Sequence, residues 1–172
     1  MNLKLPLLAT TLALALAGCA ADVTSQGANP PAAESSESSP ATKDVFSIGE
    51  TIKIDETLMI VNSAKKWTSP NEYSRPDKGA VHFIVNITLQ NKGTEKVSYN
   101  TFDYKIEDAD GVQTNTTFAA DVPKEMQSGS LAPNGKLTSN LLFQVPKNMK
   151  SLKLIYEPSF WSNQQVKVAL TK

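Results

Sequence analysis

The stretch that decides the fold is Val81-His-Phe-Ile-Val-Asn-Ile-Thr-Leu-Gln90. Its apolar side chains fall at every second position: Val81, Phe83, Val85, Ile87 and Leu89. A period of two places them on one face of an extended strand, whereas an amphipathic helix repeats at about 3.6 residues. We therefore predict a long central strand that lies over the core. The sequence Asn-Lys-Gly at 91–93 ends it with turn chemistry.

Shorter segments with alternating or continuous apolar residues flank this strand. They are residues 51–54, 58–61, 102–107, 112–117, 137–145, 152–156 and 166–170. In one of them Phe102, Tyr104 and Ile106 share a face, so all three are expected to point inward. Residues 108–111 read Asp-Ala-Asp-Gly and predict a hairpin turn, since glycine takes positive φ at no steric cost. Residues 131–135 predict another turn.

These patterns predict an all-β domain over residues 44–172. Roughly seven to nine short strands, separated by Gly, Pro, Asn and Asp turns, are typical of an antiparallel immunoglobulin-like β-sandwich. A closed barrel is the main alternative. The Cys–Trp–Cys pattern of antibody domains is absent, because the sequence contains a single cysteine.

The composition excludes several function classes. Lys plus Arg and Asp plus Glu each number 17 in the 172 residues, so the formal net charge is zero. A neutral chain lacks the basic footprint of a nucleic-acid-binding protein and the basic patch that anionic lipid headgroups attract. One cysteine excludes an intrachain disulfide and zinc sites built on several thiolates. The domain therefore depends on its hydrophobic core for stability.

The N-terminal segment, residues 1–18, is predicted to be a signal peptide. One lysine, Lys4, precedes an apolar run that is too short to span a bilayer. The run ends in Leu16-Ala17-Gly18-Cys19, which resembles the lipobox of bacterial lipoproteins. The resemblance implies that lipid is attached to the Cys19 thiol and that the chain is cut before this residue. An ordinary secretory signal followed by a chance cysteine is the alternative.

Residues 19–43 are predicted to be a lipidated cysteine followed by a disordered tether. Ser, Pro, Ala and acidic residues dominate, and such a segment cannot bury enough apolar surface to offset its ordering entropy. Acyl chains on Cys19 would hold the domain on the extracytoplasmic face of the cell membrane. Ala20 stands where an aspartate tends to retain lipoproteins at the inner membrane of Gram-negative bacteria. An outer-membrane location is therefore open if the host is Gram-negative.

Six strings in the domain, taken in order, resemble a known family. They are FSIGE (46–50), NKGTEKV (91–97), FDYKIEDADG (102–111), LAPNGK (131–136), LFQVP (142–146) and LKLIYEPSF (152–160). They are similar to bacterial secreted and lipid-anchored proteins that carry the domain of unknown function DUF4352, a family similar in turn to a secreted mycobacterial immunogenic protein. The resemblance covers residues 44–172 and implies an immunoglobulin-like sandwich in an extracytoplasmic setting. It implies no activity, because the family has no catalytic motif to carry over.

His82 is the only histidine in the sequence, so a Ser-His-Asp triad would have to use it. It lies in the predicted central strand on the face opposite the apolar set, and no nucleophile-elbow motif occurs. We therefore expect a solvent-facing strand residue without a catalytic role. A copper site would need His82 together with Met59, Met126 or Met149, but these methionines are scattered in sequence and Met59 has the pattern of a core residue.

Glu107, Asp108 and Asp110 gather at the predicted hairpin. Their spacing lacks the alternating ligands and the terminal glutamate of an EF-hand loop. We therefore expect a turn there, and no metal or other cofactor. Calcium held at a sandwich corner with residues from elsewhere in the chain is the alternative.

One long connection does not fit a minimal sandwich. Residues 67–80 read WTSPNEYSRPDKGA and hold Trp67, Tyr73 and Arg75, three residue types enriched at binding hot spots. Connections of this length are often functional, so we predict a binding loop here. The alternative is that Trp67 caps the sandwich core while the other residues are solvated. For the aromatic pair Phe160 and Trp161 we expect packing at a structural corner.

A tethered sandwich supports two function hypotheses of different kinds. The preferred one is a lipid-anchored, non-enzymatic binding or accessory module that presents loops or sheet edges to an envelope protein or polymer. The alternative is an enzyme or metal-dependent protein with an unrecognised acidic site, which would need clustered acids in a cleft. A surface protein with no specific ligand is a third hypothesis.

Overall fold

The computed structural model describes residues 44–158 and 165–171. The chain divides into two units, Met1–Ser39 and Pro40–Lys172, and all described residues belong to the second. The predicted signal peptide with its lipobox, Cys19, the tether, and the Phe160 and Trp161 pair lie outside the described residues. Within the described ranges no helix is long and apolar enough to cross a membrane.

The described residues form strands joined by turns and loops. The elements are β1 Phe46–Ser47, β2 Thr51–Ile54, β3 Thr57–Trp67, β4 Ala80–Asn91, β5 Val97–Tyr99, the 3-10 turn η1 Thr101–Asp103, β6 Tyr104–Glu107, β7 Gln113–Asn115, β8 Gly129–Leu131, β9 Lys136–Pro146, β10 Lys153–Tyr156 and β11 Val166–Ala169. Four strands, β1, β5, β7 and β8, are two or three residues long. Of these, β1, β5 and β8 were not predicted, because so short a strand shows no recognisable alternation in sequence.

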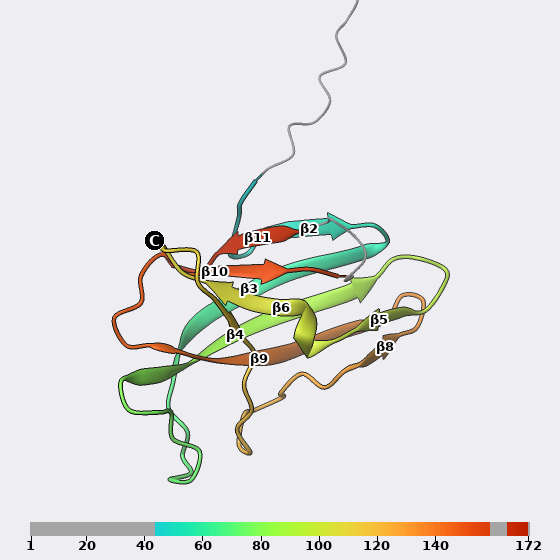
Figure 1. Cartoon of the computed structure of the whole chain (residues 1–172). Coiled ribbons are helices and arrows are strands. Elements are labelled where there is room, and N and C mark those ends of the chain that lie inside the picture. The colour runs from blue at the N-terminus through green and yellow to red at the C-terminus, as the bar shows by residue number, and fades with distance from the viewer. Residues whose placement is uncertain (1–43, 159–164, 172) are drawn as a thin grey trace, which may run out of the picture. The chain divides into compact units, whose positions relative to one another are not determined.

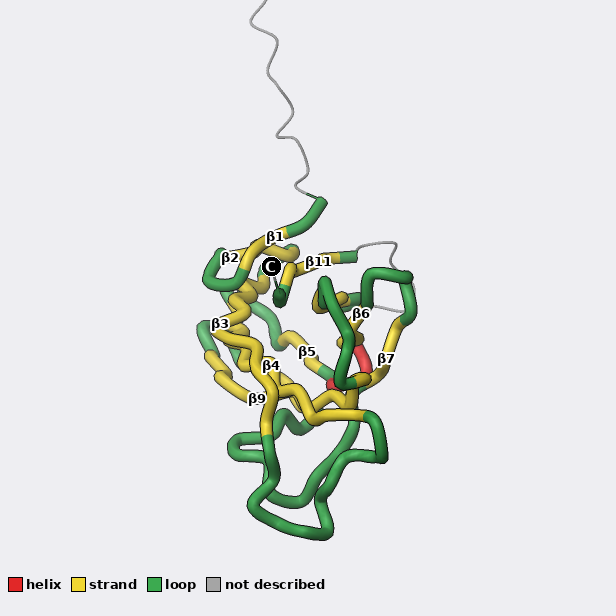
Figure 2. Tube along the Cα trace, turned by 90° about the vertical axis from the view of Figure 1, so that its left-hand side faces the viewer, coloured by secondary structure: helices red, strands yellow, loops and turns green. Residues whose placement is uncertain are grey.

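The strands form two facing sheets and a small ribbon. One sheet has the order β2-β3-β4-β9, the other β1-β11-β10-β6-β7, and β5 pairs with β8 alone. Figure 1 shows β10, β6 and β11 in front of β3, β4 and β9, and the turned view of Figure 2 separates the two layers. Within the described residues the named strand pairs are antiparallel, except for the parallel pair of β1 and β11. The predicted β-sandwich is confirmed, and the sheets do not close into the alternative barrel.

Strand β4 occupies the centre of the four-stranded sheet, as its sequence predicts. It pairs with β3 on one side and with β9 on the other. The side chains of Phe83, Val85, Ile87 and Leu89 are at most 5% exposed and face the opposite sheet. Burial of four such side chains contributes roughly 6–12 kcal/mol to the free energy of unfolding, before entropy is subtracted.

The core between the sheets draws on nearly every strand of both layers. Its buried members are Ile52, Ile54, Met59, Val61, Phe83, Val85, Ile87, Leu89, Tyr104, Ile106, Met126, Leu131, Leu141, Phe143, Val145, Leu152, Leu154, Tyr156, Val168 and Leu170. The prediction that Met59 belongs to the core is confirmed, and Met149 packs against its border.

Phe102 departs from the sequence prediction. Tyr104 and Ile106 are fully buried, but Phe102 is 77% exposed. Its expected inward position is wrong because η1 precedes β6, and a 3-10 turn breaks the two-residue alternation on which the prediction depended. Asn100 starts this turn, and its side-chain oxygen accepts a hydrogen bond from the Phe102 backbone N–H at 3.1 Å.

The predicted hairpin at 108–111 is confirmed. It joins β6 to β7, and Gly111 has a φ of +80°. The Asp108 side chain accepts backbone hydrogen bonds from Asp110 at 3.0 Å and from Val112 at 2.8 Å. Glu107 pairs instead with Lys153 across the sheet at 3.4 Å. The acidic residues of this corner therefore act in the turn and the sheet, and Asp108 is engaged by the backbone.

The outer face of the four-stranded sheet carries a ladder of polar side chains at one end. Asn62 donates to the Asn86 side chain at 2.8 Å, and Asn86 donates to the Asn140 side chain at 2.7 Å. The hydroxyls of Thr88 and Thr138 share a hydrogen bond of 2.9 Å beside them. Cross-strand pairs of this kind stabilise neighbouring strands and keep this part of the face compatible with water.

We expect the domain to lose stability in alkaline solution through a buried tyrosine pair. Tyr104 and Tyr156 stack across β6 and β10 with ring centroids 4.7 Å apart. Burial raises the pKa of Tyr156 to about 12 and that of Tyr104 well above its ordinary value. The stabilisation is therefore complete below the unfolded pKa, about 10, and is lost as pH rises through the folded values. Urea unfolding should show that the free energy of unfolding falls by roughly 2–3 kcal/mol through the ionisation of Tyr156 alone.

The double variant Tyr104→Phe, Tyr156→Phe should flatten this alkaline fall. Tyr73→Phe, at an 89% exposed position, is the matched control and should leave the fall unchanged. An equally steep fall in the double variant would show that other groups cause it.

Candidate functional site

An irregularity in β3 decides which way Trp67 points. The pairing of β3 with β4 shifts between Val61 and Ser63, which leaves Asn62 as a β-bulge. Because side chains alternate strictly along a strand, one extra residue moves every later side chain to the other face. Trp67 therefore pairs with His82 on the outer face of the sheet. The alternative that Trp67 caps the sandwich core is wrong.

His82 lies against the Trp67 ring on this outer face. The two rings stack with centroids 5.8 Å apart and an angle of 26° between their planes. His82 is 4% exposed, so the prediction of a solvent-facing histidine is wrong, although its face of the strand was predicted correctly. Burial lowers the pKa of His82 and outweighs the nearby carboxylates of Asp121 and Asp77, which act to raise it. The imidazole is therefore held in its neutral form near pH 7.

A small apolar cluster explains why this end of the outer face is covered. Ile84 and Leu142 point outward from β4 and β9, and Ala119 packs on them from the segment 116–128. Trp67 and Val122 pack against the same three residues. The segment 116–128 therefore folds over the sheet because it buries apolar side chains that the strands present on their second face.

The loop of residues 68–79 connects β3 to β4 and is fastened at two points. The Ser69 hydroxyl hydrogen-bonds to the Asp121 carboxylate, whose second contact is the Asn71 backbone N–H at 3.3 Å. At the other end the Gln144 side chain donates to the Asp77 carboxylate at 2.7 Å. Figure 1 shows this loop in green, extending beyond the ends of the strands. Fastening of both ends limits the shapes that the loop can adopt.

Between this loop and the strand ends lies a hollow, here called the loop hollow, of about 570 Å³. It is lined by Trp67, Thr68, Ser69, Pro70, Glu72, Ser74, Arg75, Pro76, Asp77, Lys78, Gly79, Ala80, Val81, His82 and Lys147. Lys147 comes from the turn after β9, where its backbone N–H donates to the Gly79 carbonyl at 3.0 Å. Three cationic and two acidic side chains thus surround an aromatic and imidazole floor.

The structure brings two of the three predicted loop residues together. Trp67 and Arg75 both line the loop hollow. Tyr73 does not line it but stands 89% exposed on the same loop, as the most exposed of the large apolar side chains in the described residues. His82 and Lys147 complete the lining and were not predicted, because the sequence shows neither the stack on Trp67 nor the approach of the β9–β10 turn.

The residue types of a hydrolytic triad occur together in Ser69, His82 and Asp121. Their contacts, however, follow a different order from those of a triad. In a triad the histidine stands between the nucleophile and the carboxylate. Here Ser69 bonds directly to Asp121, which lowers the pKa of that carboxyl, and the buried His82 Nδ1 has no hydrogen-bond partner in the described chain. The arrangement fastens the loop and does not activate the serine hydroxyl.

Within the described residues, no group of three or more His, Cys, Asp or Glu side chains is placed to hold a metal ion. Of the methionines considered with His82, Met59 and Met126 are buried in the core between the sheets, whereas His82 faces the other side of its strand. The structure therefore does not assemble the histidine and methionine set that a copper site would need.

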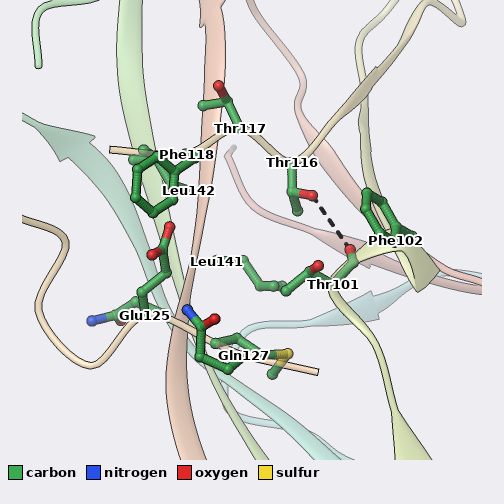
Figure 3. Close-up of a pocket in the computed structure, with 11 residues that line it drawn as sticks. Thr101, Phe102, Thr116, Thr117, Phe118, Glu125, Gln127, Leu141 and Leu142 are labelled. Carbon is green, nitrogen blue, oxygen red and sulfur yellow. Dashed lines mark hydrogen bonds between the residues drawn. The ribbon is translucent and has the colours of Figure 1, made fainter. Parts of the chain in front are cut away.

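A second hollow lies where the segment 116–128 crosses the edge of β9. It measures about 230 Å³ and is lined by Thr101, Phe102, Thr116, Thr117, Phe118, Glu125, Met126, Gln127, Asn140, Leu141 and Leu142. Figure 3 shows it with Phe118 and Glu125 on one side and Phe102 on the other, and we call it the phenylalanine pocket. It shares no lining residue with the loop hollow.

The phenylalanine pocket was missed by sequence reasoning. The alternation of residues 102, 104 and 106 predicts that Phe102 points into the core, and Phe118 stands in a stretch without periodicity. These two side chains are 77% and 72% exposed. A phenylalanine outside any alternating pattern was the available signal, because such a side chain has no strand face to bury it.

A family model gives an independent assignment of the domain. The model for "Domain of unknown function (DUF4352)" matches residues 46–167, which is most of the sandwich and both hollows. The chain belongs to the DUF4352 family. The resemblance that the sequence strings carried is therefore confirmed.

A relative of known structure supports the fold. The uncharacterized lipoprotein YjhA of Bacillus subtilis (strain 168) is 26% identical over 136 residues, which are 69% of this chain. The match spans 63% of that relative's length. The crystal structure of the yjhA protein has a TM-score of 0.59 at 22% identity and covers 73% of this chain and 98% of its own.

A more distant structure shows the same sandwich. The secreted protein MPT63 of Mycobacterium tuberculosis has a TM-score of 0.56 at 11% identity, covering 74% of this chain and 96% of its own. At this level of identity the likeness concerns the fold alone, and a DUF4352 sandwich takes its function from the residues of its own surface.

The pKa of His82 offers a direct test of the loop-hollow floor. We expect Trp67→Ala to raise the His82 pKa toward its ordinary value, because loss of the stacked ring admits water to the imidazole. Asp121→Asn should instead lower the pKa further, because it removes a negative charge that favours imidazolium. The chain has one histidine, so its ring protons can be followed by NMR titration without ambiguity. Shifts in the same direction for both variants would contradict this account.

Proposed function

We propose that this protein is a lipid-anchored, extracytoplasmic binding or accessory module without catalytic activity. The anchor is the lipid on Cys19, and the contact surface is the loop 68–79 together with the loop hollow. The partner is a protein or polymer of the cell envelope. The observation that carries the proposal is a fastened loop that exposes Tyr73 and Arg75 beside a hollow floored by Trp67 and His82.

The loop has the physical features of a preorganised binding surface. Its ends are held by Ser69 to Asp121 and by Asp77 to Gln144, so less entropy is lost when a partner binds. Tyr73 is 89% exposed and supplies a large amphipathic side chain at low entropic cost. Burial of such a side chain against a partner would remove apolar surface from water that the free protein leaves exposed.

The charges around the loop hollow favour a polar partner. Arg75, Lys78 and Lys147 line it together with Glu72 and Asp77. Charges of both signs at the rim of a site select the partner and orient its approach more than they add affinity. A protein segment or a polymer with its own mixed charges suits this lining better than an apolar ligand.

The enzyme hypothesis rests on the same neighbourhood and is less well supported. Ser69, Asp121 and His82 meet near the loop hollow, but the serine hydroxyl contacts the carboxylate and not the imidazole. Without a base on the hydroxyl, no nucleophile is activated.

A capture experiment tests the binding proposal. The full chain, purified in detergent and immobilised through a C-terminal tag, would be exposed to solubilised envelope material. We expect the double variant Tyr73→Ala, Arg75→Ala to retain the specific partner at least about tenfold less, since hot-spot truncations each cost more than about 1 kcal/mol. Both positions are exposed, so the fold should persist. Retained proteins and polymers would be quantified by mass spectrometry and carbohydrate analysis.

The matched control is Val112→Ala, Lys150→Ala, an exposed apolar and basic pair away from the loop. Equal retention by the loop variant and the parent would exclude the loop as the contact surface. Specific retention by neither would argue against the binding module.

The lipid anchor has a separate test. We expect Cys19→Ala to move the protein from the membrane fraction to the soluble fraction of the host, because no other acylation site is proposed. Fractionation with immunodetection measures this, and metabolic labelling with a fatty acid checks the modification. A Cys19→Ala protein that stays membrane-bound and labelled would contradict the anchor.

A further inference from the structure

Two highly exposed phenylalanine side chains lie at the phenylalanine pocket. Phe102, on η1, and Phe118, after β7, are the two most exposed phenylalanines of the described residues and both line it. Exposed aromatic side chains that gather at one hollow mark an interaction surface more often than scattered ones do. The pocket is therefore a candidate binding site that the loop hollow does not account for.

Glu125 gives this apolar pocket a negative charge. Figure 3 shows its carboxylate directed toward the Phe118 ring, on the wall of the hollow. Burial raises the pKa of Glu125, and a hydrogen bond with the Ala119 backbone acts in the opposite direction. The ion pairs found among the described residues, Lys105 with Glu157 and Lys153 with Glu107, do not involve it. The carboxylate thus lines a partly dehydrated pocket without a basic side chain to neutralise it.

The backbone that carries Glu125 is bound to the edge strand β9. Glu125 forms an isolated bridge with Asn140 of β9, and the flanking hydrogen bonds run from the Met126 N–H to the Asn140 carbonyl at 2.8 Å and from the Asn140 N–H to the Lys124 carbonyl at 2.9 Å. This backbone does not have to become ordered when a cation binds, which lowers the entropic cost of binding at Glu125.

The surroundings favour an ammonium group on an apolar stem. The face of the Phe118 ring attracts a cation, and ring and leucine walls suit methylene groups. An ammonium is a compact charge with three donors, and the Glu125 carboxylate on the wall of the pocket can accept from it. A guanidinium prefers two free carboxylate oxygens in a fork, and Glu125 already accepts a bond from the backbone.

We propose that the phenylalanine pocket is a binding site for a lysine side chain of a partner protein, with its ammonium beside Glu125 and the Phe118 ring and its methylene stem against the apolar walls. The inference goes beyond the proposed function, because it concerns a different site. The acidic Glu125 on its wall contrasts with the mixed charges that line the loop hollow.

The test uses the isotopically labelled full chain in detergent micelles and follows backbone and side-chain NMR signals. The probe is the peptide acetyl-Gly-Lys-Gly-amide at millimolar concentrations. We expect saturable shifts at Phe118, Glu125 and Leu142, and about tenfold weaker binding of the same peptide with an acetylated lysine Nε, which lacks the charge. The corresponding arginine peptide should bind more weakly than the lysine peptide.

Variants assign the interaction to named side chains. Glu125→Gln keeps the shape but removes the charge, and should weaken binding about tenfold. Phe118→Ala should weaken it about threefold, since the cation–ring contact at an exposed site is worth about 0.5–1 kcal/mol. Glu95→Gln, an exposed glutamate outside this pocket, is the matched control and should bind as the parent does.

Several results would overturn the proposal. They are unchanged binding by Glu125→Gln, equal binding of the acetylated peptide, tighter binding of the arginine peptide, or shifts confined to residues outside the pocket. The acetylated peptide tests the charge on the unaltered protein, so the proposal stays falsifiable if Glu125→Gln does not fold. Binding of free n-butylamine with exclusion of the lysine peptide would overturn the assignment to a partner protein. None of these results bears on the loop 68–79, whose capture experiment uses other variants.

Discussion

Strand β4 hydrogen-bonds to β3 on one side and to β9 on the other. Because of this central position, each of its two faces must either pack against other residues or be compatible with water. Its core face carries the four apolar side chains that pack on the opposite sheet. Its outer face changes character along its length, from His82 and Ile84 at one end to Asn86 and Thr88 farther on. The apolar end of the outer face must be shielded from water by other residues, whereas the polar end can remain in contact with water. The placement of the long connections follows from this difference.

The segment that covers the apolar end of this outer face also creates both hollows. The segment 116–128 packs Ala119 on Ile84 and Leu142, and its Asp121 fastens the loop 68–79 through Ser69. On one side of this cluster the fastened loop encloses the loop hollow. On the other side the segment crosses the edge of β9 and leaves the phenylalanine pocket, of which Leu142 is also a wall. Burial of one apolar cluster thus shapes two separate surfaces, one lined by charges of both signs and one by a single carboxylate.

The sandwich is shared with relatives whose sequences have diverged far from this one. TM-scores near 0.6 persist at identities of 22% and 11%, so the fold tolerates extensive exchange of surface residues. In such folds binding residues stand on connections that a rigid sheet positions. Both candidate sites in this protein obey that rule, since their distinctive side chains lie on connections and their floors on β4 or β9.

The sequence by itself determined the longer strands, the hairpin at 108–111 and the family. A period of two over residues 81–90 is a local property, as are the Asp-Ala-Asp-Gly hairpin and the position of the long connection between β3 and β4, because neighbouring residues alone decide them. Only the tertiary structure decided where Trp67, His82 and Phe102 point. A bulge at Asn62 reverses the face of Trp67, a 3-10 turn releases Phe102 from the alternation, and His82 is buried by a ring and a segment distant in sequence. Alternation predicts a face of a strand, but whether that face meets water depends on what packs over it.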